Sequence, residues 1–140
     1  MSDFEAFFAE NKVQSEDVEY VASDKFINKA TGKPVPWKLR KMDEYTNKKL
    51  KESSQKKVTG GNRVRYVTDN ETYLCKLMIG TVVFPDLNNK ELQDKWNVMD
   101  AESLLRKMLS AGEYANLMIE VQKVNDFDID FSELVEEAKN

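Results

Sequence analysis

Residues 100–124, DAESLLRKMLSAGEYANLMIEVQKV, decide the fold because they carry two apolar stripes at helical spacing, each preceded by a helix-start signal. Asp100 can cap the first helix, and Ser110 with Glu113 forms the capping-box pattern that begins the second. The two stripes consist of Leu104, Leu105, Met108 and Leu109, and of Tyr114, Leu117, Met118, Val121 and Val124. Two helices joined by so short a connection usually pack as an antiparallel or crossed pair.

Helical patterns also precede and follow this pair. Thr68 or Asp69 opens a segment whose apolar residues recur at helical spacing until Phe84-Pro85 closes it. Asn88 with Glu91 can begin a short helix, and Ser132 can cap a last turn or two. These signals predict that residues 68–140 form a bundle of short helices.

The first half of the chain is mixed. Residues 3–10 predict a short amphipathic helix, and 18–27 with 35–42 predict the two arms of a β-hairpin. Pro36 would cost a hydrogen bond in a central strand, so the second arm is either an edge strand or irregular at its start. A polar helix can run from Asp43 to about Lys56, with Gly60-Gly61 ending it.

The segment that follows, residues 63–67, is either a third strand or an extended arm. The chain is therefore expected to be one α+β domain over residues 1–140. A short N-terminal helix, a β-hairpin and a basic segment (1–67) precede a mostly α-helical C-terminal bundle of short helices (68–140).

Composition excludes several kinds of enzyme. The 140 residues contain no histidine and one cysteine, Cys75, which removes the Ser-His and Cys-His nucleophile pairs and a thiolate-clustered zinc site. Carboxylates are plentiful, but nothing singles out two of them as an acid and base pair. We expect no enzymatic activity, no catalytic residues and no cofactor, with Cys75 in the core.

One acidic stretch has the spacing of a calcium loop. Counting from Asp126, acidic residues occupy positions one, three, five and twelve, the last being Glu137. The sixth position, normally a glycine that turns sharply, is Phe131, and the usually apolar eighth position is Glu133. We therefore expect an acidic turn and no metal site.

Charge is distributed in three blocks. Residues 1–24 carry a net charge of −6, residues 38–66 a net charge of +7, and residues 86–140 a net charge of −7. The basic block, with Trp37, Tyr45 and Tyr66 interleaved, could serve a nucleic-acid-binding regulator. Opposite blocks in one chain more often pair with each other or with copies of the same protein, so we expect no nucleic-acid partner and possible self-association.

The chain also lacks the signals of membrane insertion and secretion. No stretch approaches the roughly 18 consecutive apolar residues of a membrane span, and residues 1–5 lack the basic and apolar blocks of a signal peptide. We therefore expect a cytoplasmic protein with no membrane partner.

Several short motifs, taken in order, resemble one protein family. They are Phe84-Pro85-Asp86-Leu87, then Glu91-Leu92-Gln93-Asp94, then Leu104-Leu105-Arg106-Lys107-Met108-Leu109 and Gly112-Glu113-Tyr114. In this order they resemble the XkdN-like phage tail assembly chaperones, encoded by phages and prophages of Gram-positive bacteria. The resemblance covers almost the full length and is least distinct over residues 48–67.

The resemblance implies a non-enzymatic protein that binds the tape measure protein, the long helical ruler of a phage tail, while the tail tube polymerises around it. Other tail proteins are further possible partners. Such a chaperone acts in the cytoplasm of the bacterial host and is absent from the mature virion. From the apolar stripes we expect the partner to contact Leu104, Leu105, Met108, Leu109, Tyr114 and Met118.

Overall fold

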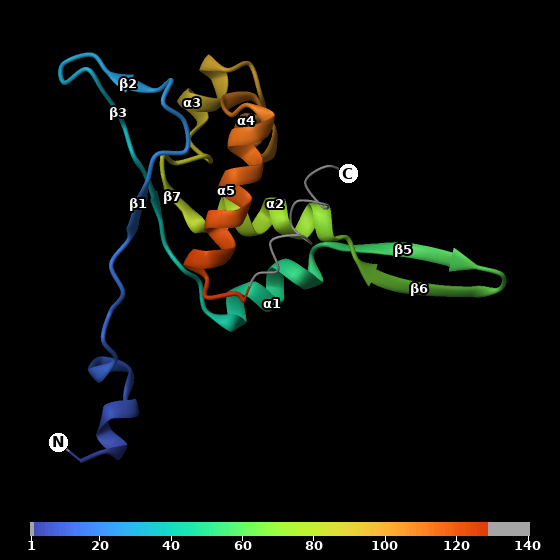
Figure 1. The fold of residues 1–140 in the computed structure, drawn as a ribbon. Coiled ribbons are helices and arrows are strands. Elements are labelled where there is room, and N and C mark those ends of the chain that lie inside the picture. The colour runs from blue at the N-terminus through green and yellow to red at the C-terminus, as the bar shows by residue number, and fades with distance from the viewer. Residues whose placement is uncertain (1, 129–140) are drawn as a thin grey trace.

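Helix α2 (Asn70–Thr81) is the centre of the fold, and half of its twelve residues are buried. The computed structural model describes residues 2–128 and packs α1 (Glu44–Glu52), α4 (Ala101–Met108) and α5 (Ala111–Val124) against α2 (Figure 1). The helix begins where the sequence predicted, because the Asp69 carboxylate accepts a hydrogen bond from the Thr72 amide. The predicted caps of α1, α4 and α5 are confirmed in the same way.

A small antiparallel sheet covers the end of α2. Its strand order is β1 (Val18–Tyr20), β4 (Trp37–Leu39) and β7 (Val82–Phe84). Trp37 and Leu39 are buried in the core, whereas Lys38 between them is exposed, as the alternation of a strand requires. The expected α+β fold class is confirmed.

The long hairpin predicted over residues 18–42 is confirmed, with an interruption. Beyond β1 and β4 the two arms pair again as β2 (Ile27–Asn28) and β3 (Lys33–Pro34), which end in a turn at Gly32. Pro36 lies between β3 and β4, outside both ladders, so the first residues of the second arm are irregular as expected. The alternative of an edge strand is wrong, since β4 is the middle strand.

Helix α2 ends earlier than the sequence predicted. Val82 was expected to continue its apolar stripe, but residues 82–84 form β7 and pair with β4. The β-branched Val82 and Val83 favour extended backbone, and Pro85 disfavours a helical conformation of Phe84. The free edge of β4 supplies the hydrogen bonds. The strand thus turns the end of α2 into part of the sheet.

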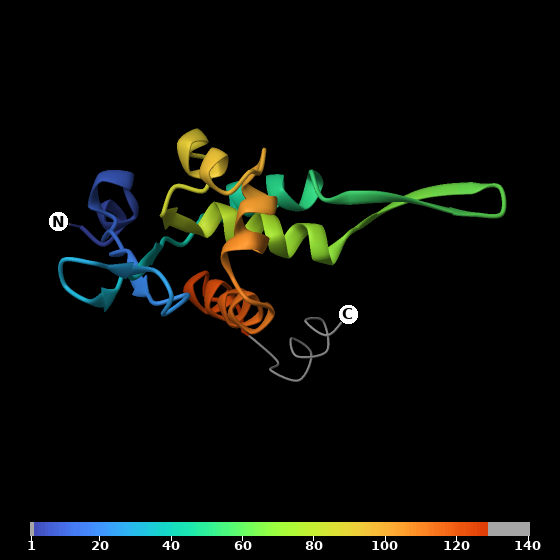
Figure 2. The same cartoon turned by 90° about the horizontal axis from the view of Figure 1, so that it is seen from above.

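A second correction concerns Gly60-Gly61, which does not end α1. That helix ends at Glu52, and both glycines lie at the tip of a hairpin of β5 (Gln55–Gly60) and β6 (Arg63–Thr68). Gly61 has a φ of +61°, which favours glycine at this turn. Residues 63–67 are thus a strand, and the hairpin projects from the helical body (Figures 1 and 2).

The predicted N-terminal amphipathic helix is also wrong in detail. This stretch forms two short 3₁₀ turns, η1 (Phe4–Phe7) and η2 (Ala9–Asn11), in which no residue is buried. Ser2 does accept a hydrogen bond from the Glu5 amide, as the capping pattern suggested. With no packing surface beneath it, so short a segment gains too little to continue as an α-helix.

The remaining helix, α3 (Lys90–Lys95), is capped by Asn89, one residue later than predicted. The single cysteine of the chain, Cys75 on α2, is buried as expected. A Cβ atom on Gly80 would lie 3.0 Å from the Met42 side chain and 3.8 Å from Leu50 of α1, so a glycine at this position allows α1 to approach closely. The cap at Ser132 and most of the calcium-like stretch lie outside the described residues.

Two further properties bear on function. Within residues 2–128, no helix has the length and apolar character that a membrane crossing would need. The same part of the chain brings no three acidic, cysteine or histidine side chains together as a metal site.

Candidate functional site

A pocket of about 570 Å³ lies between the first turns of α2, the end of α4 and the first half of α5. Leu74, Leu109 and Met118 are buried and form its apolar floor. Tyr114 and Ala115 are half-buried on its wall. The exposed rim consists of Asn70, Glu71, Arg106, Ser110 and Ala111. Its volume falls within the roughly 300–1,000 Å³ typical of ligand pockets.

Local sequence explains why the pocket forms at this place. Helix α4 ends at Met108, Leu109 is extended, and Ser110 already caps α5. The capping box is complete: the Glu113 amide donates to Ser110 Oγ at 3.1 Å, and the Ser110 amide donates to the Glu113 carboxylate at 2.8 Å. The first of these two helices therefore ends beside the start of the second, and both meet the N-terminal end of α2.

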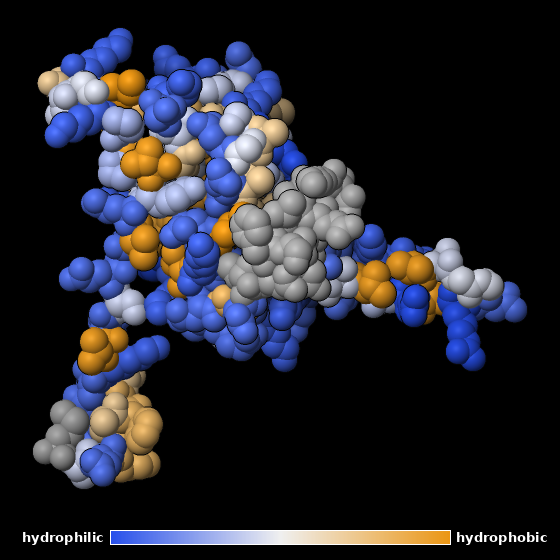
Figure 3. Space-filling view, viewed as in Figure 1, coloured by the Kyte–Doolittle hydropathy of each residue, from blue (hydrophilic) through white to orange (hydrophobic). Residues whose placement is uncertain are grey.

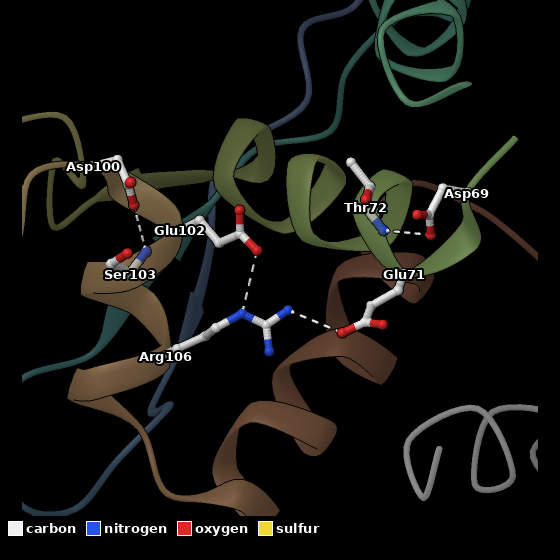
Figure 4. A network of polar contacts seen from close by, with 7 residues as sticks. All are labelled: Asp69, Glu71, Thr72, Asp100, Glu102, Ser103 and Arg106. Atoms are coloured by element: carbon white, nitrogen blue, oxygen red, sulfur yellow. Dashed lines mark hydrogen bonds and ion pairs between the residues drawn. The ribbon is translucent and has the colours of Figure 1, made fainter. Parts of the chain in front are cut away.

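Arg106 connects the three helices around the pocket. Its guanidinium lies 3.4 Å from Glu102 on α4 and 3.5 Å from Glu71 on α2, as Figure 4 shows. It also lies 5.1 Å from the centroid of the Tyr114 ring on α5, a cation–π distance. Because the charged groups are exposed, each ion pair contributes little stability. Their main effect is to place one guanidinium at the rim.

Near neutral pH the wall of the pocket is neutral. Burial, reinforced by the neighbouring Cys75 thiol, raises the pKa of Tyr114 well above its ordinary value. Burial also raises the pKa of Cys75, which makes its thiol a poor nucleophile. The pocket therefore offers apolar contact, hydrogen bonds and a rim with charges of both signs.

The structure separates the six residues that the sequence suggested for partner contact. Leu109, Tyr114 and Met118 line the pocket, whereas Leu104 and Leu105 are fully buried in the core and do not line it. Met108 is half-buried and packs against the core. Fully buried leucines contribute to folding and have no surface left for a partner in this conformation.

Sequence reasoning missed the contribution of α2 to the pocket and the role of Arg106. Leu74 belonged to the apolar stripe of α2, but nothing in that stripe indicates that α2 meets the end of α4. The spacing of Glu102 and Arg106, four residues apart on one helix, was a visible signal for their ion pair.

Part of the basic block of residues 38–66 is paired with acidic residues of the same chain. Arg40 donates two hydrogen bonds to Asp17, at 2.8 and 3.0 Å, and Lys41 pairs with Asp126 at 3.0 Å. The hydrogen-bonded Arg40 guanidinium lowers the pKa of Asp17. The N-terminal and C-terminal acidic blocks thus neutralise part of the basic block, as the charge pattern suggested.

Comparison with known proteins assigns the family. A sequence model described as phage XkdN-like tail assembly chaperone protein, TAC, matches residues 4–139. The chain belongs to this family. The resemblance noted from the sequence motifs is therefore confirmed.

Individual relatives span nearly the whole chaperone. Phage-like element PBSX protein XkdN of Bacillus subtilis strain 168 is 30% identical over 139 residues, covering 96% of this chain and 93% of that protein. The uncharacterized protein YqbN of the same strain is 29% identical over 141 residues, covering 99% and 93%. A crystal structure of YqbN superposes with a TM-score of 0.76 at 24% identity, covering 91% of this chain and 99% of that one, and thus shares the fold.

Ser110→Ala in this chaperone is expected to lower the free energy of unfolding by about 1 kcal/mol, because it removes one half of the capping box beside the pocket. Urea denaturation monitored by circular dichroism measures the change. Ser15→Ala is the matched control, since Ser15 is exposed and lies outside the helices, and its effect should stay within about 0.5 kcal/mol. Equal losses in both variants would contradict the capping argument.

Proposed function

We propose that this tail assembly chaperone binds the tape measure protein through the pocket between α2, α4 and α5. The observation that carries the proposal is an open pocket with an apolar floor and a charged rim in a member of this family. A long amphipathic ruler exposes apolar stripes until the tail tube encloses it, and exposed stripes of this kind favour aggregation. A chaperone that covers these apolar stripes until the tail is assembled prevents this aggregation.

The chemistry of the pocket suits a helical partner. The floor of Leu74, Leu109 and Met118 can accept apolar side chains that recur at helical spacing. Met118 is flexible and tolerates different partner side chains along a repetitive ruler. At the rim, Arg106 and Glu71 can pair with acidic and basic side chains that flank an apolar stripe.

The proposed activity consists of binding the tape measure protein and then releasing it. Binding and release need no bond chemistry, so the function is non-catalytic and requires no cofactor. The chaperone acts in the host cytoplasm before the tube closes around the ruler, and it is absent from the mature virion. Contacts with other tail proteins are compatible with the remaining surface.

Filling the pocket should abolish the protection of the tape measure protein. Ala111 lies on the exposed rim, so Ala111→Trp can occupy the pocket without removing core atoms. Co-expression of tape measure fragments with the wild-type chaperone should keep the fragments soluble, whereas co-expression with Ala111→Trp should leave most of each fragment in the pellet. The soluble fraction on a gel is the measurement.

The matched control introduces a tryptophan at another position on α5. Asn116 is exposed and does not line the pocket, so Asn116→Trp should protect the fragments as well as the wild type does. Melting temperatures of both variants should equal that of the wild type. Full protection by Ala111→Trp, or equal loss in both variants, would show that the partner binds elsewhere.

A further inference from the structure

Two exposed elements of the molecule take no part in the pocket. One is the N-terminal arm, defined as residues 2–17, and the other is the β5–β6 hairpin, residues 55–68. Both extend away from the helical body, in different directions (Figures 1 and 2). Each presents apolar side chains to solvent, which is costly unless something covers them.

The N-terminal arm combines solvent-exposed aromatic rings with negative charge. Phe4 and Phe7 are 73% and 85% exposed, and Val13 is 88% exposed. The arm contains five acidic residues and only one basic residue, Lys12. Its base is held to the sheet region by the hydrogen-bonded ion pair between Asp17 and Arg40. Beyond that anchor it is an acidic, aromatic segment.

The hairpin combines apolar side chains with positive charge. Strand pairing places Lys57 opposite Tyr66 and Thr59 opposite Val64 on one face, and the other face carries Lys56, Val58, Arg63, Arg65 and Val67. Val64 is 54% exposed and Tyr66 is 65% exposed. The hairpin has four basic residues and no acidic one. Within the described residues, none of those four bases forms an ion pair.

An isolated two-stranded ribbon is only marginally stable in water. Most of this hairpin lies beyond the helices and has no third strand or helix against it (Figure 1). Figure 3 shows apolar atoms among the charged ones on the hairpin, and a second apolar patch at the end of the N-terminal arm. A partner that covers the hairpin would therefore stabilise it.

The two elements complement each other in charge and in apolar character, but the helical body lies between them (Figure 2). We propose that the N-terminal arm of one copy docks on the β5–β6 hairpin of a second copy. The phenylalanine rings then cover Val64 and Tyr66 on the face that carries Lys57. The arm's carboxylates pair with Lys57 and, at the edges of the narrow two-stranded ribbon, with the long basic side chains that extend from the other face, Lys56, Arg63 and Arg65. Because arm and hairpin are different surfaces, the contact is head-to-tail and leaves a free arm and a free hairpin for further copies.

This self-association does not depend on the pocket or on its occupant. A head-to-tail contact that does not close on itself produces an open chain of copies. Ion pairs at exposed positions weaken with salt, so the association should be strong at about 50 mM salt and largely lost at about 500 mM. Sedimentation analysis at high protein concentration should give an average mass above the 16.2 kDa of one chain only at low salt.

Charge reversal tests the pairing in trans. The arm variant carries Asp3→Lys, Glu5→Lys and Glu10→Lys, and the hairpin variant carries Lys56→Glu, Arg63→Glu and Arg65→Glu. Each variant alone should be monomeric at low salt, because its arm and hairpin have like charges. A mixture of the two should associate again, because each arm then meets a hairpin of opposite charge, a result that contact within one chain cannot produce.

One control and one further test variant accompany the mixture. The control is a triple variant that changes the net charge as much as the hairpin variant does, at exposed positions elsewhere: Lys29→Glu, Lys33→Glu and Lys107→Glu. It should associate as the wild type does. The test variant is Phe7→Ser. Because no residue of η1 or η2 is buried, this substitution cannot unfold the helical body. It should weaken association at least tenfold.

Three results would overturn the proposal: a monomeric wild type at low salt, wild-type association of the Phe7→Ser or arm variant, or no association in the mixture. A generic DNA duplex is titrated in parallel at about 50 mM salt. Duplex binding by a monomeric wild type, lost in the hairpin variant, would assign the hairpin to nucleic acid instead.

Discussion

Leu105→Ala is expected to lower the free energy of unfolding by about 2–5 kcal/mol, because Leu105 has no exposed surface and packs in the core formed by α2, α4, α5 and the sheet. Truncation removes apolar contact and leaves a cavity that the surrounding helices can only partly close. Chemical denaturation with circular dichroism measures the loss. The variant should lose the proposed protection of the tape measure protein only to the extent that it unfolds.

The matched control for Leu105 is an apolar residue on the surface. Met99 is 94% exposed, so Met99→Ala should change stability by less than about 0.5 kcal/mol. If Leu105→Ala kept full stability but failed to bind the partner, Leu105 would be a contact residue, as the apolar stripe suggested, and the described packing would be contradicted.

Asn125→Ala is expected to lower the free energy of unfolding by about 1–3 kcal/mol, although Asn125 is only half-buried and lies just after the last residue of α5. Its side chain accepts a hydrogen bond from the Met42 amide at 2.9 Å and donates to Thr81 Oγ1 at 2.9 Å. Thr81 is fully buried at the end of α2, and Met42 precedes Asp43, the N-cap of α1. Removing the amide leaves buried polar groups without partners at the point where three helices meet.

A double-mutant cycle separates this network from a local effect on α5. Thr81→Val removes only one of the two hydrogen-bond partners that Asn125 has outside α5. The double variant should lower the free energy of unfolding by less than the sum of the two single variants. Strict additivity of the two free energies, measured by urea denaturation, would mean that Asn125 and Thr81 do not act together.

The helices were predictable because their start signals are local. Asp43, Asp69, Asp100 and Ser110 each precede an apolar or polar pattern of helical period, and each side chain does cap the helix that follows. A cap requires only the three residues that follow it, so sequence alone contains the information. The hairpin of residues 18–42 was predictable for a similar reason, since turn residues separate two alternating arms.

The errors arose where a distant partner decides the local conformation. Val82 could extend a helix or form a strand, and the free edge of β4, more than forty residues away, decides for the strand. Gly60-Gly61 can end a helix or turn a hairpin, and the choice depends on pairing between β5 and β6. Neither partner is visible in the local pattern.

The pocket was only half predictable for the same reason. Both stripes of residues 100–124 were visible, but an apolar stripe does not distinguish the side packed against α2 from the side left open. Leu105 and Leu109 lie in one stripe, yet only Leu109 reaches the pocket. The contribution of Leu74 and the position of Arg106 follow from how α2 crosses this helix pair, which depends on the whole core.

Methionine methyl resonances test the central proposal most directly, because one of the chaperone's six methionines, Met118, lies in the pocket floor. The chaperone is labelled at its methionine methyl groups, and NMR spectra are recorded while a purified tape measure fragment is added. The proposal predicts that the Met118 signal shifts or broadens with the fragment, whereas the signal of exposed Met99 stays in place. Binding that leaves Met118 unchanged, or the absence of any binding, would contradict the proposal.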